Sequence, residues 1–587
     1  MRSRAVALMF SLMLVCCSTA PPTRPDAAAR VTAVADEYYA AVLNEMPEQA
    51  YFAGVALERH DGLSDKSTAW LAGWQKREDA WLAALDAIDG DALFGKPAWV
   101  THGVLRELLA AWKDARVCRG EWWMSVNQQG SWDTDLATLA ERQPVESPVL
   151  RSQALARWSR VPAYIRQETA NLRAGLAHGY SAPRPVAELM LKRIDGLLPP
   201  VGGSLAEHPY ASPAVRATDE GFKAQYLAVL ERDVLPAVRE YRTFLSEEYL
   251  PKARTTLAVS VLPQGAACYQ TLLRAQTTLQ RTPEQVYALG QKVVAGNMDD
   301  VRAIGKRIFG TDDFGTVIRK VKAAPDNRYE GARDLLTDSR AMVARAQAAM
   351  PRFFVAVPTQ PVVVEPLPEY RDRAGAGSEY EAPASGRPGR YLVSLLAPGG
   401  TSRAVAEIVA FHETWPGHHL QTAYAQRVRG LHPVSQLISN SGYDEGWARY
   451  AEQLAEEAGL YHTDYAKVLR RARGARGLVV DPGIHAMAWT RDQAVAFLIE
   501  GGMFDEQSAP RAVDRIAGSP GQVTSYDSGA QEFFAIRGEA EAALGSSFNL
   551  RRFNDALLDH GAITLPMLRS RMQRWIAGER SQLAAKH

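Results

Sequence analysis

The sequence predicts a mainly α-helical fold that includes one small β-sheet or hairpin. Apolar residues recur at helical spacing over 27–255, on segments rich in Ala, Leu, Arg and Glu, and the pattern returns over 283–308 and 329–350. Two short apolar runs, 362–364 and 391–396, lie on either side of a stretch rich in Gly, Ser and Pro. Short apolar runs bounded by turn-forming residues are typical of strands.

The composition is that of a large globular protein with balanced charge. The chain has 587 residues, of which 47% are hydrophobic and 23% charged. Such a chain has enough apolar side chain to bury a sizeable core. The 67 Lys and Arg residues nearly balance the 66 Asp and Glu residues, so the net charge of the protein does not favour binding to nucleic acid or to an anionic membrane surface. We therefore expect no nucleic-acid partner, and nothing in the sequence indicates the oligomeric state.

The first residues have the pattern of a secretory signal. Arg2 and Arg4 precede the apolar run 5–15, which is shorter than the roughly 20 apolar residues that span a bilayer. Cys17 completes a stretch that resembles a bacterial lipobox, in which the cysteine is lipidated and becomes the new N-terminus. We therefore expect a lipoprotein signal peptide over 1–16 and a lipid anchor at Cys17.

Ordinary cleavage after Ala20 is the alternative, because Cys16 departs from the Gly or Ala that usually precedes the lipidated cysteine. Ser18, rather than Asp, follows Cys17, which by resemblance favours the outer membrane over the inner one. The expected location is the periplasmic face of the outer membrane, with 17–29 as a linker.

Two helical regions are expected after the linker. The N-terminal region, 30–255, holds helical patterns that are interrupted where Pro and Gly gather. Its clearest helices are predicted at 30–42, 67–88, 101–117 and 222–247. The C-terminal region, 256–587, contains the later helices and the β element at about 360–397, with 371–389 as the loop between its strands.

Cys118 and Cys268 are the two cysteines that remain as free thiols once the signal peptide is removed and Cys17 is lipidated. In an oxidising envelope compartment two cysteines in a large chain can pair, so we expect a disulfide. Two buried free thiols are the alternative reading. Either way the pair has a structural role.

A His-Glu pair closes a helix that we expect to begin near Ser402. In the HExxH pattern the two histidines stand four apart on one helical face and chelate zinc. Here the next histidines follow His412 by six and seven residues. In an unbroken helix His419 lies about 20° off the face of His412, and His418 about 120° off. Pro416 breaks that regularity, however, and a two-residue bulge would return His418 to the ligand position, so geometry leaves the choice open.

Residues around this pair and downstream of it resemble the bacterial domain-of-unknown-function 885 family. The resemblance rests on His412, Glu413, Pro416, Gly417, His418, Glu445, Gly446, Trp447, Ala448, Tyr450 and Glu452. It extends over most of the mature chain, including 268–269, 377–388 and 482–491. Members are regarded as zinc metallopeptidase relatives of the gluzincin type, which implies a large helical metallopeptidase-like fold with a central cleft. The family pattern favours the histidine after Pro-Gly, His418, as the second ligand.

A catalytic zinc site needs three protein ligands and an open position for water. We expect Glu445 to complete the set with His412 and His418, because it lies 33 residues beyond His412 on a segment with helical spacing. Asp444 points about 100° away and is expected to act as a cap or to support a ligand. Glu413 is the expected general base, which takes a proton from the zinc-bound water.

Four further residues are weaker candidates. By resemblance to gluzincins, Tyr526 or His485 is a candidate donor to the oxyanion, although a hydrogen-bonded role in the core fits either one. Arg491 and Arg537 are candidates to bind a substrate carboxylate. Arginines on helices are more often solvated or paired with an acid of the same protein.

Together these features predict a zinc-dependent peptidase that hydrolyses oligopeptides. A strand near Tyr391 is expected to pair with an extended substrate backbone just before the zinc helix. The rival interpretations are a zinc-binding or partner-binding lipoprotein without useful turnover, and a hydrolase of a non-peptide amide or a cell-wall cross-peptide. Glu413 beside three candidate ligands favours activity, because purely structural zinc sites use four closed ligands.

Overall fold

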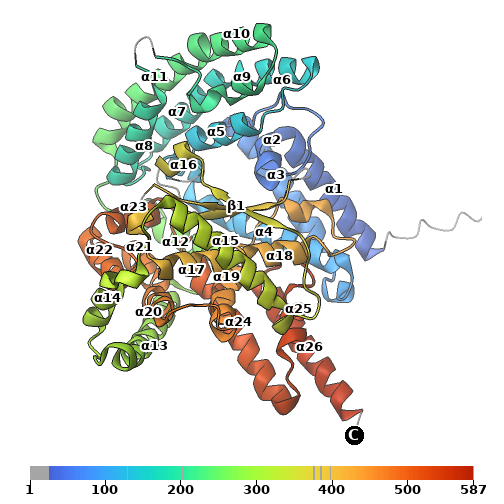
Figure 1. Ribbon diagram of the computed structural model, residues 1–587. Helices are drawn as coiled ribbons and strands as arrows, with labels where there is room; N and C mark the ends of the chain where they lie inside the picture. Colours follow the sequence, from blue (N-terminus) through green and yellow to red (C-terminus); the bar gives the residue numbers. More distant parts are fainter. Residues whose placement is uncertain are drawn as a thin grey trace, which may run out of the picture.

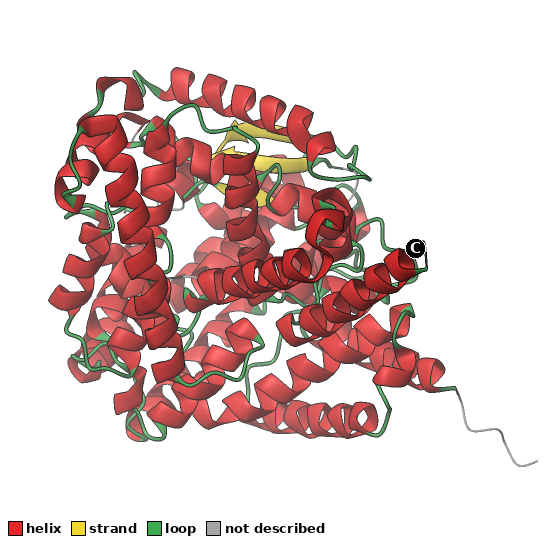
Figure 2. Cartoon of the chain, turned by 90° about the horizontal axis from the view of Figure 1, so that it is seen from below, coloured by secondary structure: helices red, strands yellow, loops and turns green. Residues whose placement is uncertain are grey.

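A computed structural model describes residues 26–128, 130–200, 203–373, 377–383, 387–396 and 398–585. The expected signal peptide, 1–16, and the expected lipidation site, Cys17, lie outside these residues. Within them the chain is mainly helical with one small sheet, which confirms the predicted fold class (Figures 1 and 2). None of the described helices combines the length and the hydrophobicity that a bilayer crossing requires.

The N-terminal half consists of helices that agree with the predicted helical patterns. The predicted helix 222–247 is divided, because short π-helical segments at Leu230–Val234 and Leu245–Tyr249 follow its two α-helical parts. The α-helices of this half are α1 (Ala27–Glu45), α2 (Pro47–Ala53), α3 (Thr68–Asp86), α4 (Pro97–Ala115), α5 (Trp132–Arg142), α6 (Pro148–Trp158), α7 (Val161–Ala177), α8 (Arg184–Leu197), α9 (Ser212–Arg216), α10 (Glu220–Val229) and α11 (Leu235–Phe244).

The C-terminal half is also helical, and its boundaries follow local capping signals. The longest helix starts at Thr282 with a capping box and ends at Gly310 in the left-handed conformation. The α-helices here are α12 (Gly265–Thr277), α13 (Pro283–Phe309), α14 (Phe314–Ala323), α15 (Ala332–Ala349), α16 (Glu369–Arg373), α17 (Arg403–Glu413), α18 (His418–Ala425), α19 (Ser441–Glu457), α20 (Asp464–Arg473), α21 (Gly477–His485), α22 (Arg491–Glu500), α23 (Ser508–Gly518), α24 (Thr524–Leu544), α25 (Leu550–Leu558) and α26 (Leu565–Ala584).

The β element is a sheet of three short strands, β1 (Val362–Pro366), β2 (Glu379–Glu381) and β3 (Gly389–Val393), in the order β1-β3-β2. β1 pairs with β3 in parallel, so the two predicted strands do not form a hairpin. A parallel pair needs a crossover, and the predicted loop 371–389 supplies part of it and contains β2. Tyr391 therefore lies on the central strand, and the expectation that this strand pairs with substrate is wrong.

Two main hydrophobic cores stabilise the molecule. The larger one combines α1, α3 and α4 with most of the C-terminal elements, for example Leu105 with Phe411 and Trp447. The second belongs to α5–α11 and includes Trp158 and Tyr241. Figure 1 shows these later N-terminal helices above the sheet, with α24 and α26 projecting at the opposite end. The N-terminal helices thus contribute to two cores rather than to one.

A disulfide joins the 3-10 turn that follows α4, Arg116–Cys118, to α12. It links Cys118 and Cys268, which are 150 residues apart in sequence and only 2% exposed. A crosslink over so long a loop restricts the unfolded chain strongly.

The double variant Cys118→Ala/Cys268→Ala is expected to lose about 2–4 kcal/mol of unfolding free energy, because the unfolded chain regains the entropy of the open loop. Urea denaturation under non-reducing conditions would measure the change. Adding a reductant should lower the midpoint of the wild type and leave the double variant unchanged. Equal midpoints of the two proteins without reductant would contradict a stabilising role.

Candidate metal centre

The helix that contains the His-Glu pair, α17, ends at that pair. Ser402 caps α17 by accepting a hydrogen bond from the backbone N–H of Val405, and the helix ends at Glu413. Pro416 lies in the non-helical connection, and a new helix, α18, begins at His418. The chain therefore changes direction between two helices, instead of continuing as the unbroken or bulged helix considered from sequence.

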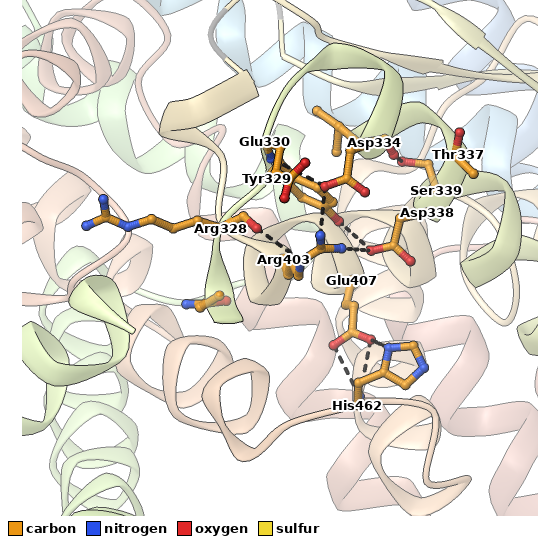
Figure 3. A network of polar contacts seen from close by, with 12 residues as sticks. Arg328, Tyr329, Glu330, Asp334, Thr337, Asp338, Ser339, Arg403, Glu407 and His462 are labelled. Carbon is orange, nitrogen blue, oxygen red and sulfur yellow. Dashed lines mark hydrogen bonds and ion pairs between the residues drawn. The ribbon is translucent and has the colours of Figure 1, made fainter. Parts of the chain in front are cut away.

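Polar contacts fix the first half of α17 against α15 and against the connection between α19 and α20 (Figure 3). The guanidinium of Arg403 pairs with Asp334 at 2.7 Å and with Asp338 at 3.0 Å, both on α15. One turn further on, the nearly inaccessible carboxylate of Glu407 accepts a hydrogen bond from the backbone N–H of His462 at 3.2 Å. Burial raises the pKa of Glu407 to about 7. These anchors leave α17 little freedom to shift along its axis.

The end of α17, the start of α18 and the first turns of α19 bring the three expected ligands together. The Nε2 atom of His412 lies 3.3 Å from Oε2 of Glu445, and Nε2 of His418 lies 3.6 Å from the same oxygen. One donor atom from each residue lies within 4.8 Å of the others. His419 points elsewhere, so the structure selects His418 for the cluster.

These distances fit a tetrahedral zinc ion. Zinc bonds of about 2.0–2.2 Å to nitrogen and oxygen place neighbouring ligand atoms roughly 3.3–3.6 Å apart. The two distances to Glu445 agree with that separation. Two histidines and one glutamate are also the donor set of several catalytic zinc sites, which keep a further position open for water.

The electrostatics of the cluster favour a cation between its members. Burial by itself lowers the pKa of His418, but the hydrogen bond and charge of Glu445, together with the charge of Glu413, raise it to about 9. Burial raises the pKa of Glu445, and the bonds to His412 and His418 outweigh that effect and lower it. The site therefore stabilises positive charge at a partly buried position, which favours a metal ion.

A second carboxylate of α19 orients His412. Glu452 is fully buried and accepts a hydrogen bond from Nδ1 of His412 at 2.9 Å. A carboxylate only accepts at neutral pH, so Nδ1 bears a proton, and Nε2, which faces Glu445, is the nitrogen left to bind a metal ion. Sequence analysis did not assign this role to Glu452. Its spacing of seven residues from Glu445 was the available signal, because seven residues return to nearly the same helical face.

The side chain of Glu452 is itself held by two arginines. Arg473 lies 2.6 Å from its carboxylate and Arg449 lies 3.2 Å away. Burial raises the pKa of Glu452, and these two charges, with the bond to His412, outweigh that effect and lower it. The carboxylate is therefore ionised when it orients the imidazole.

His418 is oriented in the same manner through an amide. Its Nδ1 atom lies 3.4 Å from Oε1 of Gln421, whose Nε2 donates to Asp444 at 2.5 Å. Since Asp444 accepts from the amide nitrogen, the amide oxygen faces His418 and accepts its Nδ1 proton. Asp444 thus supports a ligand, one of the two roles considered for it, and sequence analysis did not identify Gln421.

Glu413 directly follows His412, and the charges of the cluster residues act on the pKa of its carboxyl group. Burial raises its pKa, while the charges of His412 and His418 and a hydrogen bond from the backbone of Tyr380 act in the opposite direction. A carboxylate with a raised pKa is better matched to general-base chemistry near neutral pH than an ordinary surface acid.

Tyr526 reaches the cluster because two helices cross in close contact. A Cβ atom on Gly446 of α19 would lie 2.6 Å from the backbone of Gly529 on α24, so only glycine permits this approach. The Tyr526 ring lies 6.2 Å from that of His412, nearly parallel to it. Burial and the charge of Glu445 raise the pKa of Tyr526 to about 12, so its hydroxyl remains a donor at neutral pH.

His485 has its contacts in the core, away from the cluster. Its Nδ1 atom accepts from the backbone N–H of Val259 and its Nε2–H donates to the carbonyl of Ile516, both at 3.1 Å. Burial lowers the pKa of its imidazole to about 3. Both ring nitrogens are thus engaged by backbone, which matches the core role considered beside the catalytic one.

The two arginines considered for substrate binding have partners within the protein. Arg491 pairs with Asp514 at 2.7 Å, and Arg537 pairs with Glu457 at 3.0 Å. None of the contacts described for either guanidinium reaches the cluster. These ion pairs fit the alternative considered from sequence, in which both arginines pair with acids of the same protein, better than they fit binding of a substrate carboxylate.

The described chain is thus a mainly helical protein with a partly buried His₂Glu cluster on three successive helices. It belongs to the family described as "Bacterial protein of unknown function (DUF885)", whose family model matches residues 47–572. Comparison with curated proteins finds no match.

Two solved structures have the same fold. A "putative lipoprotein from Colwellia psychrerythraea" is similar with a TM-score of 0.85 and 21% identity, over 94% of this chain and 100% of that chain. A "putative lipoprotein of unknown function from Shewanella oneidensis" gives a TM-score of 0.74 and 18% identity, again over 94% and 100%. At these identities the likeness establishes the fold.

The wild-type protein is expected to retain about one zinc ion per chain after dialysis, and His418→Ala to lose it, because a tight site needs all three ligands. Metal content by mass spectrometry measures both. His462→Ala is the matched control, since that side chain is 62% exposed and contacts Glu407 rather than the cluster. A full zinc equivalent in His418→Ala would rule out His418 as a ligand.

The variant Glu452→Gln is expected to bind zinc about 10–100-fold more weakly, because the charge that orients His412 is removed. Competition with a chromogenic chelator measures the affinity. Glu456→Gln is the control: it makes the same change on the same helix, where Glu456 also pairs with two arginines, Arg470 and Arg471. Equal affinities of the two variants would show that Glu452 does not support the site.

Proposed function

We propose that this protein is a zinc-dependent peptidase, related to the gluzincins, that hydrolyses peptide bonds of oligopeptides. One observation supports this proposal above the others. His412, His418 and Glu445 converge at distances suited to zinc, and a partly buried carboxylate, Glu413, lies directly beside them. A purely structural site has no need of that fourth group, whereas a hydrolase requires a base.

Each residue has a defined part in the proposed reaction. Bound zinc would lower the pKa of a water molecule and polarise the scissile carbonyl. Glu413 takes a proton from the attacking water and passes it to the leaving amine. The hydroxyl of Tyr526 donates a hydrogen bond to the carbonyl oxygen as that oxygen gains negative charge. Glu452 and Gln421 hold the two imidazoles in the tautomers that direct Nε2 inward.

An extended peptide is the proposed form of the substrate. Among the described strands, β2 is an edge strand with β3 on one side only, and the backbone of Tyr380 on β2 reaches Glu413. A peptide that pairs with the free edge of β2 would pass beside the base. We propose that substrates enter a central cleft next to this edge, which would favour short or unfolded peptides.

The proposed location is the cell envelope, with a lipid anchor at Cys17 on the periplasmic face of the outer membrane. The signal-like N-terminus supports this location, and both similar structures are described as lipoproteins. The disulfide between Cys118 and Cys268 suits an oxidising compartment.

Zinc-loaded wild-type protein is expected to cleave members of a diverse synthetic peptide mixture, with products identified by mass spectrometry. Glu413→Gln should keep its zinc and lose activity by about 10²–10⁴-fold, because the base is removed. Glu456→Gln, the same change on α19 at a residue that pairs with Arg470 and Arg471 rather than with the cluster, should cleave like the wild type.

Equal cleavage by wild type and Glu413→Gln would show that Glu413 is not the base. No cleavage by any zinc-loaded protein would overturn the peptidase proposal. It would favour zinc or partner binding without turnover, or a non-peptide or cell-wall amide substrate, which purified cell-wall fragments would then test.

A further inference from the structure

Arg449 of α19 lies on the same helical face as Glu445 and Glu452. It follows Glu445 by four residues and precedes Glu452 by three, and positions with these spacings are neighbours on a helix surface. Its side chain is 15% exposed, and its Nη1 atom lies 3.2 Å from Oε1 of Glu452. The same guanidinium lies over the ring of Tyr526, with Cζ 5.3 Å from the ring centre. Arg449 therefore contacts both the carboxylate that orients His412 and the candidate oxyanion donor.

Four side chains thus form a closed circuit of contacts. His412 is bonded to Glu452 at 2.9 Å, and Glu452 is paired with Arg449. Arg449 lies over the ring of Tyr526, within the roughly 6 Å at which a cation is attracted to the face of an aromatic ring. The Tyr526 ring in turn lies 6.2 Å from that of His412, with 19° between the two planes. Each side chain of the circuit is therefore held by two of the others.

The backbone around Tyr526 is fixed by contacts of its own. The hydroxyl of Ser525, the preceding residue, lies 2.8 Å from that of Ser441, which joins the start of α24 to the start of α19. The close approach of Gly446 and Gly529 sets the distance between the same two helices further along. With the backbone held, the place of the phenol hydroxyl depends on the direction of the side chain alone.

Neutralising Glu452 does not by itself explain the place of Arg449. Arg473 pairs with the same carboxylate at the shorter distance of 2.6 Å. Its other described hydrogen bond is to the sulfur of Met503, at 3.8 Å, and none of its described contacts is with the ring of Tyr526. Two guanidinium groups thus serve one carboxylate, and only one of them also holds the phenol ring.

We propose that Arg449 is a positioning residue for Tyr526. The guanidinium holds the phenol ring beside His412, so that the hydroxyl stays where the carbonyl oxygen of a substrate gains negative charge. Through Glu452, the same guanidinium links the place of this donor to the orientation of a metal-binding imidazole. The inference deepens the proposed function and rests on it, because Tyr526 acts as an oxyanion donor only if the protein hydrolyses peptides.

Kinetics of zinc-saturated variants test this role on a peptide that the wild type cleaves. Tyr526→Phe removes the donor and should lower kcat by about 10²–10³-fold. Arg449→Met should lower kcat by roughly 10–100-fold, because a misplaced donor loses much of its effect. KM should change by less than about 3-fold in both. The double variant should match Tyr526→Phe within about 3-fold, since no hydroxyl is left to position.

Two further variants separate the ring contact from the ion pair. Arg449→Lys keeps a cation that can lie over the ring and should retain kcat within about 5-fold of the wild type. Arg473→Met is the matched control, because it removes the other cation from Glu452 and leaves the ring contact in place; at zinc saturation it should retain kcat within about 3-fold.

Three kinetic results would each overturn the proposal. Equal losses of kcat in Arg449→Met and Arg473→Met would show that Arg449 serves Glu452 alone. Multiplying losses in the double variant with Tyr526→Phe would show that Arg449 acts independently of the hydroxyl. A kcat of Arg449→Lys as low as that of Arg449→Met would show that a cation over the ring is not what matters.

A second measurement does not depend on turnover. With 3-fluorotyrosine in place of Tyr526, fluorine NMR of the zinc-loaded protein reports on the ring directly. Arg449→Met should broaden or split the resonance, because the released ring samples more than one direction, and Arg473→Met should leave it unchanged. If the wild type cleaves no peptide, the proposed function fails while this spectrum still decides whether Arg449 holds the ring. A single resonance in Arg449→Met, as sharp as that of the wild type, would refute it.

Discussion

The imidazole of His412 lies between two carboxylates of one helix, and the candidate metal centre depends on that arrangement. Glu445 faces Nε2 and Glu452 faces Nδ1, two turns apart on the same side of α19. One helix therefore supplies a candidate ligand and also orients the neighbouring imidazole. Removing these charges from water is costly, and Arg449 and Arg473 offset the cost for Glu452.

The supporting helices hold this arrangement from two directions. Arg403 and Glu407 fix α17 to its neighbours before it reaches the cluster. On the opposite side, the glycine contact between Gly446 and Gly529 lets α24 approach α19 closely enough for Tyr526 to reach His412. The break after Glu413 then allows consecutive histidines of α18 to serve the cluster and, through the Tyr380 hydroxyl, the sheet separately. Rigid elements on all sides are what a site with sub-ångström tolerances requires.

Local signals predicted the helices well and the sheet only in part. The capping box at Thr282 and the apolar spacing that follows it define α13, because both depend on residues near in sequence. The strand near Tyr391 was equally clear from its apolar residues, but the strands that pair with it were not. Strand order depends on the crossover between β1 and β3, and the apolar pattern of a single strand contains no information about that crossover. The same limit applies to His485, whose partners Val259 and Ile516 come from distant segments.

The sequence by itself determined the fold class, the types of the candidate ligands and the position of Glu413 beside His412, because these follow from periodicity and from adjacent residues. Only the tertiary structure decided between His418 and His419, since that choice depends on where the chain breaks after Glu413 and on what surrounds each ring. It alone also revealed Glu452 and Gln421 as partners of the ligands. Burial and hydrogen-bond direction arise when separate helices pack, and no single segment contains that information.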